Sequence, residues 1–172
     1  MEYFYMRPDI ECKDDYIRIQ MGKEQYFETE AQVVFSDLSS EREIPDFMEI
    51  QFQMQNMYIV STRMKELLMI YADDLTATPF ILVDSKEKKQ ENFWKIKLKE
   101  IEELSCEYIN LTEKVEDLQI QNKFLKNQYI VAFKRGRKTY WIASLHFAEN
   151  FMRKNMFGVN WVKVKMEEMD YE

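Results

Sequence analysis

The most regular pattern in the chain is an alternation of apolar residues and lysines between positions 94 and 99. Trp94, Ile96 and Leu98 occupy the even positions, and lysines occupy the odd ones. A period of two is typical of a strand with one buried and one solvated face. Shorter apolar runs predict further strands over Tyr3–Met6, Tyr16–Met21, Gln32–Phe35, Met57–Val60, Pro79–Val83 and Trp161–Met166.

Two other stretches have a helical period, with apolar residues recurring every three or four positions. The first contains Met64, Leu67, Leu68 and Tyr71, and the second contains Phe147, Ala148, Phe151 and Met152. Ser61 precedes the first stretch and Ser144 the second, where a serine hydroxyl accepts a hydrogen bond from a free amide of the first turn. We therefore predict a short helix after each serine, with Gly158 as the C-terminal stop of the second.

The run Lys-Arg-Gly-Arg at positions 134–137 separates two apolar runs, Tyr129–Phe133 and Thr139–Ala143. Two such runs around a short turn that contains glycine predict a β-hairpin. The segment 100–127 supports two interpretations. Asn110 and Glu113 are spaced as a capping box of a helix, whereas Leu118 and Ile120 alternate as in a strand.

One order of elements occurs twice along the chain. Tyr58–Ser61 leads into the first helix and Trp141–Ser144 into the second, and a strand follows each helix. We therefore predict an α+β fold with a mixed, mostly antiparallel sheet, two short helices and a repeated strand–serine–helix–strand unit. A chance match of short apolar patterns is the competing interpretation of the repeat.

Composition supports one domain over residues 1–172, because no linker rich in proline, glycine or serine divides the chain. Within it we distinguish a β-rich N-terminal segment, residues 1–45, from a core over residues 46–166. No apolar stretch approaches the roughly 20 residues of a membrane-spanning helix, and the N-terminus lacks a secretory signal. Cys12 and Cys106 have no partner spacing, which is typical of reduced thiols. We expect a cytoplasmic protein without a membrane partner.

The formal net charge of −7 argues against nucleic acid as a partner, since phosphate binding needs a positive field. Two acidic blocks, at residues 28–49 and 100–117, carry much of the negative charge. Basic residues at 134–138 adjoin aromatic ones, as in a nucleic-acid stacking platform. We interpret them as a solubilising hairpin tip. The methionines between positions 48 and 69 are predicted to lie mostly in the core, with a place in an adaptable binding surface left open for Met54 and Met57.

Residues for catalysis are sparse. His146 is the only histidine, and Glu149 is its nearest partner on the same predicted helix face. The three glycines are isolated, so no phosphate-binding loop is present. We therefore expect no catalytic residue, no cofactor and no metal. An enzyme built on His146 with Cys106 or distant carboxylates is the competing hypothesis.

The chain resembles, over residues 46–164, the bacterial immunity-protein family numbered eleven among those of polymorphic toxin systems. The resemblance covers about two-thirds of the chain and is carried by apolar, structural motifs. These motifs are Tyr58–Ser61, Met64–Leu68, Pro79–Asp84, Phe93–Trp94, Tyr140–Ser144 and Phe157–Val159. Ala143 and His146 depart from the commoner residues of the family without breaking the pattern.

The resemblance implies a cytosolic α+β protein that binds and neutralises a cognate toxin, and it brings no catalytic residues. We expect neutralisation by steric occlusion, with acidic side chains aiding the contact if the toxin is basic. The predicted partner-binding residues are Asp73, Asp74, Glu100, Glu102 and Glu103. The alternative function is a structural or regulatory interaction protein of a phage or mobile element. The sequence leaves the oligomeric state open.

Overall fold

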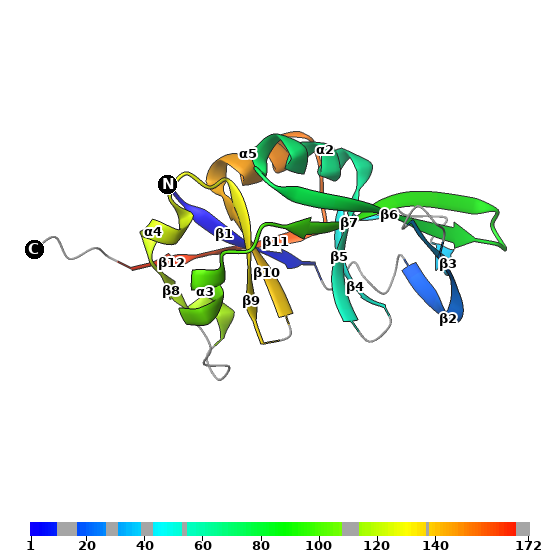
Figure 1. Ribbon diagram of the computed structural model, residues 1–172. Coiled ribbons are helices and arrows are strands. Elements are labelled where there is room, and N and C mark those ends of the chain that lie inside the picture. Colours follow the sequence, from blue (N-terminus) through cyan, green and yellow to red (C-terminus); the bar gives the residue numbers. More distant parts are fainter. Residues whose placement is uncertain are drawn as a thin grey trace, which may run out of the picture.

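A computed structural model describes residues 1–9, 17–26, 31–38, 43–52, 55–107, 114–136 and 138–167. The described part of the chain is α+β, with mostly antiparallel strands and short helices, as predicted (Figure 1). Its α-helices are α2 (Thr62–Tyr71), α3 (Glu102–Glu107), α4 (Asn122–Leu125) and α5 (Leu145–Arg153). The sequence predicted α2 and α5, which lie side by side along one side of the molecule (Figure 1).

The larger sheet has six strands in the order β2-β3-β6-β7-β5-β4. Its strands are β2 (Ile17–Tyr26), β3 (Gln32–Leu38), β4 (Phe47–Phe52), β5 (Gln55–Ser61), β6 (Leu75–Asp84) and β7 (Lys89–Leu98). Only β3 and β6 are parallel, and every other pair is antiparallel. Within the segment 46–52, which the sequence pattern left unassigned, residues 47–52 form the edge strand β4.

The smaller main sheet has the order β11-β1-β10-β9 and is wholly antiparallel. Its strands are β1 (Tyr3–Pro8), β9 (Ile130–Arg135), β10 (Lys138–Ser144) and β11 (Val159–Lys163). β1 lies between β10 and β11, so the start of the chain pairs with strands about 135 to 160 residues away. A third, two-stranded sheet joins β8 (Gln119–Ile120) to β12 (Lys165–Met166) in parallel.

The predicted hairpin is confirmed as β9–β10, with Gly136 in its turn at a φ of 62°. Both serine caps are also confirmed. Ser61 Oγ accepts a hydrogen bond from Met64 N at 3.2 Å, and Ser144 Oγ accepts one from Phe147 N at 3.3 Å. The proposed capping box at 110–113 lies outside the described residues.

The prediction that Gly158 stops the second helix is wrong. α5 ends at Arg153, and Asn155 takes the left-handed conformation at a φ of 51°. Asparagine tolerates this conformation better than most residues, so the chain leaves the helix before it reaches Gly158. Gly158 instead begins the approach to β11 at a φ of 99°, against the backbone of Phe47.

Each capped helix connects two strands that have one antiparallel strand between them. α2 joins β5 to β6 across β7, and α5 joins β10 to β11 across β1. However, β6 has ten residues and β11 has five, and their pairing partners differ. The two segments share an order of elements, and the repeated unit stays a prediction.

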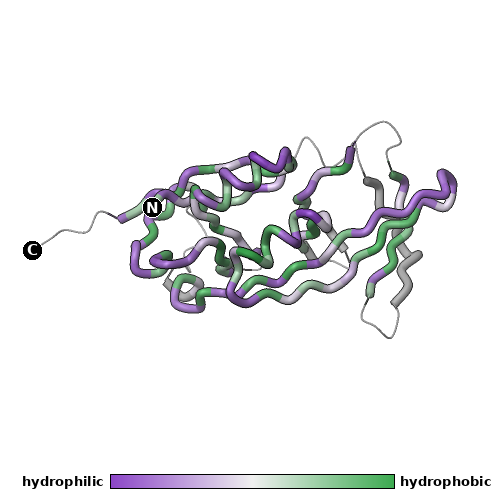
Figure 2. The backbone as a smooth tube through the Cα atoms, turned by 90° about the horizontal axis from the view of Figure 1, so that it is seen from above, coloured by the Kyte–Doolittle hydropathy of each residue, from purple (hydrophilic) through white to green (hydrophobic). Residues whose placement is uncertain are grey.

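The apolar side chains that the structure describes form three buried clusters, and the first lies where the helices meet both main sheets. Met64 and Leu68 of α2 and Phe147 and Phe151 of α5 belong to this cluster, with Trp141 of β10. Hydrophilic residues gather at the tip of the β6–β7 hairpin, which projects from the end of the molecule opposite the N-terminus (Figure 2). The buried stripes of α2 and α5 therefore set the position of the helices over the sheets.

Asp46 connects three segments beneath the start of α2. Its carboxylate accepts hydrogen bonds from Ser61 Oγ at 2.5 Å, Arg63 Nε at 2.5 Å and Phe157 N at 3.0 Å. The side chain is 1% exposed. Asp46 holds the pKa of the Arg63 guanidinium above its usual value, because its carboxylate accepts the hydrogen bond from Arg63 Nε. The start of α2 is therefore tied to β4 and to the loop before β11.

Candidate partner-binding surface

The predicted acidic residues lie in two segments, the turn after α2 and the stretch that follows β7. Asp73 and Asp74 are exposed in the turn between α2 and β6. The backbone of Lys99, just after β7, donates a hydrogen bond to Asp74 O at 3.1 Å. This bond places the turn beside the segment that contains the other predicted residues.

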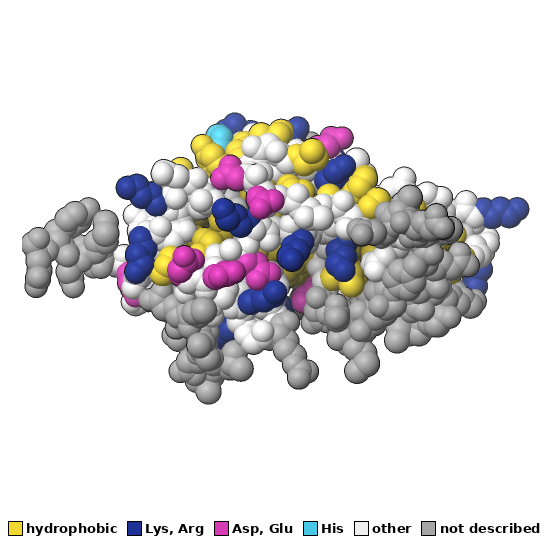
Figure 3. Space-filling model, viewed as in Figure 1, with side chains coloured by type: hydrophobic (Ala, Val, Ile, Leu, Met, Phe, Trp, Pro, Cys, Tyr) yellow, Lys and Arg dark blue, Asp and Glu magenta, His cyan; other side chains and the backbone are white. Residues whose placement is uncertain are grey.

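The surface around these two segments carries both signs of charge. Glu102 and Glu103 are exposed in the first turn of α3, whereas Glu100 is half-buried and forms an ion pair with Lys134 at 3.1 Å. Lys97 and Lys99 are exposed on the adjacent strand. Acidic and basic side chains are accordingly interspersed on the face shown in Figure 3. The uniformly acidic block in the sequence becomes a mixed surface, because neighbouring strands bring lysines into it.

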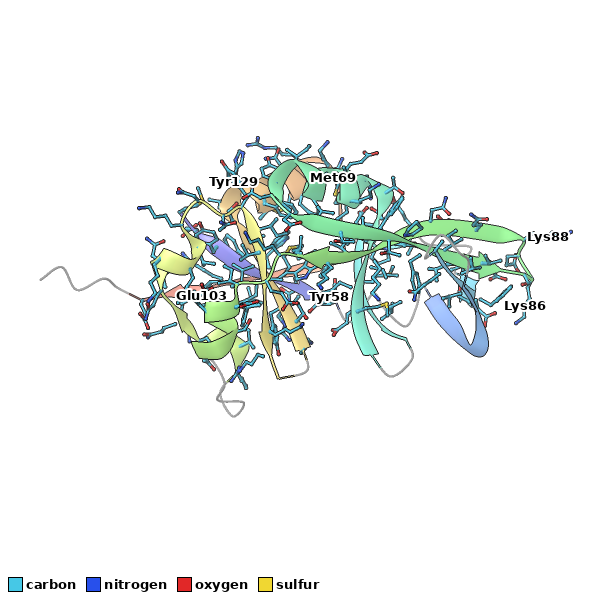
Figure 4. The ribbon with its side chains drawn as sticks, viewed as in Figure 1. Tyr58, Met69, Lys86, Lys88, Glu103 and Tyr129 are labelled. Carbon is cyan, nitrogen blue, oxygen red and sulfur yellow. The ribbon has the colours of Figure 1, made fainter. Side chains whose placement is uncertain are left out.

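Sequence reasoning missed an apolar patch beside the Asp73–Asp74 turn. Met69 and Ile70 of α2 are 60% and 72% exposed. Tyr129 and Met152 are also exposed, at 43% and 52%. Met69 and Tyr129 lie on the same side of the molecule (Figure 4). Hydrophobic side chains gather over the two helices in the space-filling view (Figure 3). We call Met69, Ile70, Tyr129 and Met152 the helical patch.

A signal for this patch was present in the sequence. Met69 and Ile70 fall outside the buried stripe of α2, since consecutive helix positions are separated by 100°. The expectation that methionines 48–69 lie in the core holds for Met48 and Met64, which are buried. It is wrong for Met69, because the buried face of α2 is already filled by the predicted stripe.

The outer face of α2 is acidic as well as apolar. Glu66 is exposed on the helix, and Asp73 and Asp74 are exposed in the turn that follows it. The two cations of α2 are held by other groups: Arg63 binds Asp46, and Lys65 Nζ lies 3.7 Å from the centre of the Trp94 ring. The face next to Met69 and Ile70 therefore presents mainly carboxylates.

His146 is exposed at the start of α5 and packs against two tyrosine rings. Its ring centre lies 5.6 Å from that of Tyr71 and 5.9 Å from that of Tyr129. Glu149 forms an ion pair with Arg153 at 3.6 Å.

Cys12 lies outside the described residues, and the side chain of Cys106 is not among the described ones. Where side chains are described, histidine, cysteine and carboxylate groups form no cluster of three suited to a metal ion. None of the helices in the described part is long and apolar enough to cross a membrane.

A cleft opens where the chain leaves β7 of the larger sheet and reaches β9 of the smaller main sheet. β7 pairs with β5 only at Phe93–Lys95. After β7, Ala132 of β9 donates a hydrogen bond to Lys99 O at 3.2 Å and accepts one from Ile101 N at 2.9 Å. Between these contacts, hairpins β4–β5 and β9–β10 project side by side (Figure 1). The space between them, the hairpin cleft, has a volume of about 290 Å³.

The hairpin cleft has an apolar floor and charged walls. Met57, Ile96, Leu98 and Trp141 are apolar members of its lining. Lysines at 95, 97, 134 and 138 and glutamates at 49 and 100 supply the charges. Lys138 pairs with Glu49 at 3.3 Å, as Lys134 does with Glu100. Arg135 is also buried. Lys134, Arg135 and Lys138 of hairpin β9–β10 are therefore largely engaged within the protein. Arg137 lies outside the described residues.

Tyr58 closes one side of the hairpin cleft, between β5 and hairpin β9–β10 (Figure 4). Its hydroxyl donates a hydrogen bond to Thr139 O at 2.8 Å, and its ring stacks on Phe47 with 5.1 Å between ring centres. Burial raises the pKa of the Tyr58 phenol well above its ordinary value, and Glu49 and Tyr140 raise it further. Tyr58 therefore holds the two main sheets together while it remains protonated.

Replacing Tyr58 with phenylalanine is expected to lower the free energy of unfolding by about 1 kcal/mol at pH 7, because one hydrogen bond is lost and the ring is kept. Since the folded pKa of Tyr58 is raised, its stabilising effect is full below about pH 10 and is lost as the pH rises toward the folded pKa. Urea unfolding at pH 7 and pH 10.5 should show the difference between wild type and variant narrowing at the higher pH.

The control for this experiment is Tyr129→Phe, since Tyr129 is exposed on the helical patch. We expect a change within about 0.5 kcal/mol at both pH values. A difference between wild type and Tyr58→Phe that stays constant with pH would contradict the role assigned to the phenol.

No protein-family model, no curated protein and no solved structure matches this chain.

Proposed function

We propose that this chain is a non-catalytic, cytoplasmic immunity-type protein that binds a cognate bacterial toxin and neutralises it by steric occlusion. The proposal is motivated by the resemblance of residues 46–164 to an immunity-protein family. The observation that carries its structural part is the helical patch, in which Met69 and Ile70 are exposed beside the carboxylates of Asp73 and Asp74.

An apolar centre within a polar rim is the usual anatomy of a protein–protein interface. Methionine and tyrosine are enriched in such centres, and the helical patch contains both types. The carboxylates of Glu66, Asp73 and Asp74 favour a partner surface with basic residues around an apolar contact. Glu102 and Glu103, on the neighbouring edge, extend this acidic rim toward α3.

The test is to express the product of the gene adjacent to this one, alone and together with this chain. We expect the neighbour to be toxic alone, to be tolerated with this chain, and to co-purify with it. The variant Ile70→Asp should weaken the affinity about thirtyfold, since a charge in the centre of an interface costs about 2 kcal/mol or more. Titration calorimetry measures the affinity, and circular dichroism checks that the variant is folded.

The charge contribution is tested by Asp73→Lys with Asp74→Lys, for which we expect at least about tenfold weaker binding. Glu87→Lys is the matched control, because Glu87 is an exposed carboxylate in the distant β6–β7 turn. The affinity of the Glu87→Lys variant for the toxin should stay within about twofold of that of the wild type. A neighbour without toxicity, or equal losses for the control and the double variant, would overturn the proposal. Self-association with no toxin gene nearby would favour the structural alternative.

A further inference from the structure

We propose that the hairpin cleft is a second binding site, separate from the helical patch, that takes an extended peptide segment with an acidic side chain between two apolar ones. The first support is the free edge of β7. Its residues 96–98 pair with β6 on one side, whereas the pairing with β5 on the other side ends at Lys95. An extended peptide recognises such an edge by adding a strand to the sheet.

The space beside this edge is open because the strands on both sides diverge. The part of β5 before Ile59 lies apart from β7, since residues 55–58 of β5 pair with β4 and not with β7. On the other side, the backbone hydrogen bonds to β9 are made by Lys99 and Ile101, after β7 has ended. The edge is therefore free over about three residues, and the cleft lies directly beside it.

The charges of the cleft indicate the sign of its ligand. Both glutamates of the lining already have a lysine partner, Lys138 for Glu49 and Lys134 for Glu100. Lys95 and Lys97 have no carboxylate partner within 4 Å in the described part of the chain, and Lys97 is exposed. The two lysines thus give the cleft a locally positive wall in a protein that carries a net negative charge.

The geometry of a strand gives the pattern of the peptide. Directly opposite residues of paired strands point to the same face, and successive residues point to opposite faces. A residue opposite Lys97 therefore lies beside its ammonium group, with Lys95 diagonally adjacent, and an acidic side chain is preferred there. The residues opposite Ile96 and Leu98 face the apolar floor near Trp141, where valine or isoleucine fits.

The probe is the capped peptide Thr-Val-Glu-Val-Thr, compared with Thr-Val-Lys-Val-Thr, in titrations followed by amide resonances of the full chain. We expect the acidic peptide to shift the amides of residues 95–98 and to bind at least about tenfold more tightly than the basic one. Lys97→Glu should weaken binding by a similar factor. Lys97→Gln, which removes the charge without reversing it, should have a smaller effect of the same sign.

The matched control is Lys99→Glu. Lys99 is exposed directly after the same strand but does not line the cleft. The affinity of the Lys99→Glu variant for the acidic peptide should therefore stay within about twofold of that of the wild type. Equal binding of the two peptides, shifts confined to other residues, or equal losses for Lys97→Glu and Lys99→Glu would overturn the proposal. Acetate that reproduces the shifts at the same concentration would also overturn it, because the site would then bind a simple anion. None of these outcomes depends on the toxin experiment.

Discussion

Replacing Asp46 with alanine is expected to lower the free energy of unfolding by about 3 kcal/mol. The buried carboxylate accepts hydrogen bonds from Ser61, Arg63 and the backbone of Phe157, so its removal leaves several donors without a partner. Hydrogen bonds to a charged group are worth more than neutral ones, but Arg63 is 41% exposed and regains water. Chemical denaturation at pH 7 measures the loss.

Two variants separate the causes of this effect. Asp46→Asn keeps the size of the side chain but removes its charge, so we expect an intermediate loss. Glu43→Ala is the control, because Glu43 also contacts Arg63, at 3.3 Å, but is 74% exposed. Exposed ion pairs contribute little, so this variant should change stability by less than about 0.5 kcal/mol. A similar loss for Glu43→Ala and Asp46→Ala would show that the ion pair, not the buried network, is responsible.

The second large effect is expected at Gly158, where alanine should cost about 3 kcal/mol. An added Cβ would lie 2.7 Å from Phe47 O and 2.7 Å from the Cβ of Pro45. The φ of 99° is also unfavourable for any residue with a side chain. The backbone must therefore shift, and the contact between the loop before β11 and the start of β4 must loosen. Thermal and urea unfolding measure the loss.

Gly136 provides the comparison for this prediction. It has a φ of 62° and is exposed in the β9–β10 turn. Asparagine is common in this left-handed conformation, so Gly136→Asn should be nearly neutral, and Gly136→Ala should cost about 1 kcal/mol. If Gly158→Ala costs no more than Gly136→Ala, backbone conformation alone accounts for the effect and the contact with Phe47 does not.

The elements that were predicted correctly are those with local causes. The alternation at 94–99 correctly placed β7, and Ile96 and Leu98 are buried while Lys97 and Lys99 are exposed. Ser61 and Ser144 cap their helices through amides only three residues away. The one wrong helix end also has a local cause, since glycine was preferred to asparagine as the stop.

The candidate sites were predicted less completely. The acidic residues at 73–74 and 100–103 do lie near one another, but the exposed apolar residues of the helical patch were not recognised from the sequence. The hairpin cleft was not predictable at all, because its walls come from β5, β7 and hairpin β9–β10. The network of Asp46 likewise joins residues up to 111 positions apart.

By itself, the sequence determined the class of the fold, the main strands and the two capped helices, because hydrophobic period and capping depend on neighbouring residues. Only the tertiary structure decided that β1 lies between β10 and β11, and that the segment after β7 forms a bridge to β9 at Glu100. Strand pairing is selected by contacts between distant residues, and a local pattern does not distinguish among the possible partners. Both proposed binding surfaces depend on those pairings.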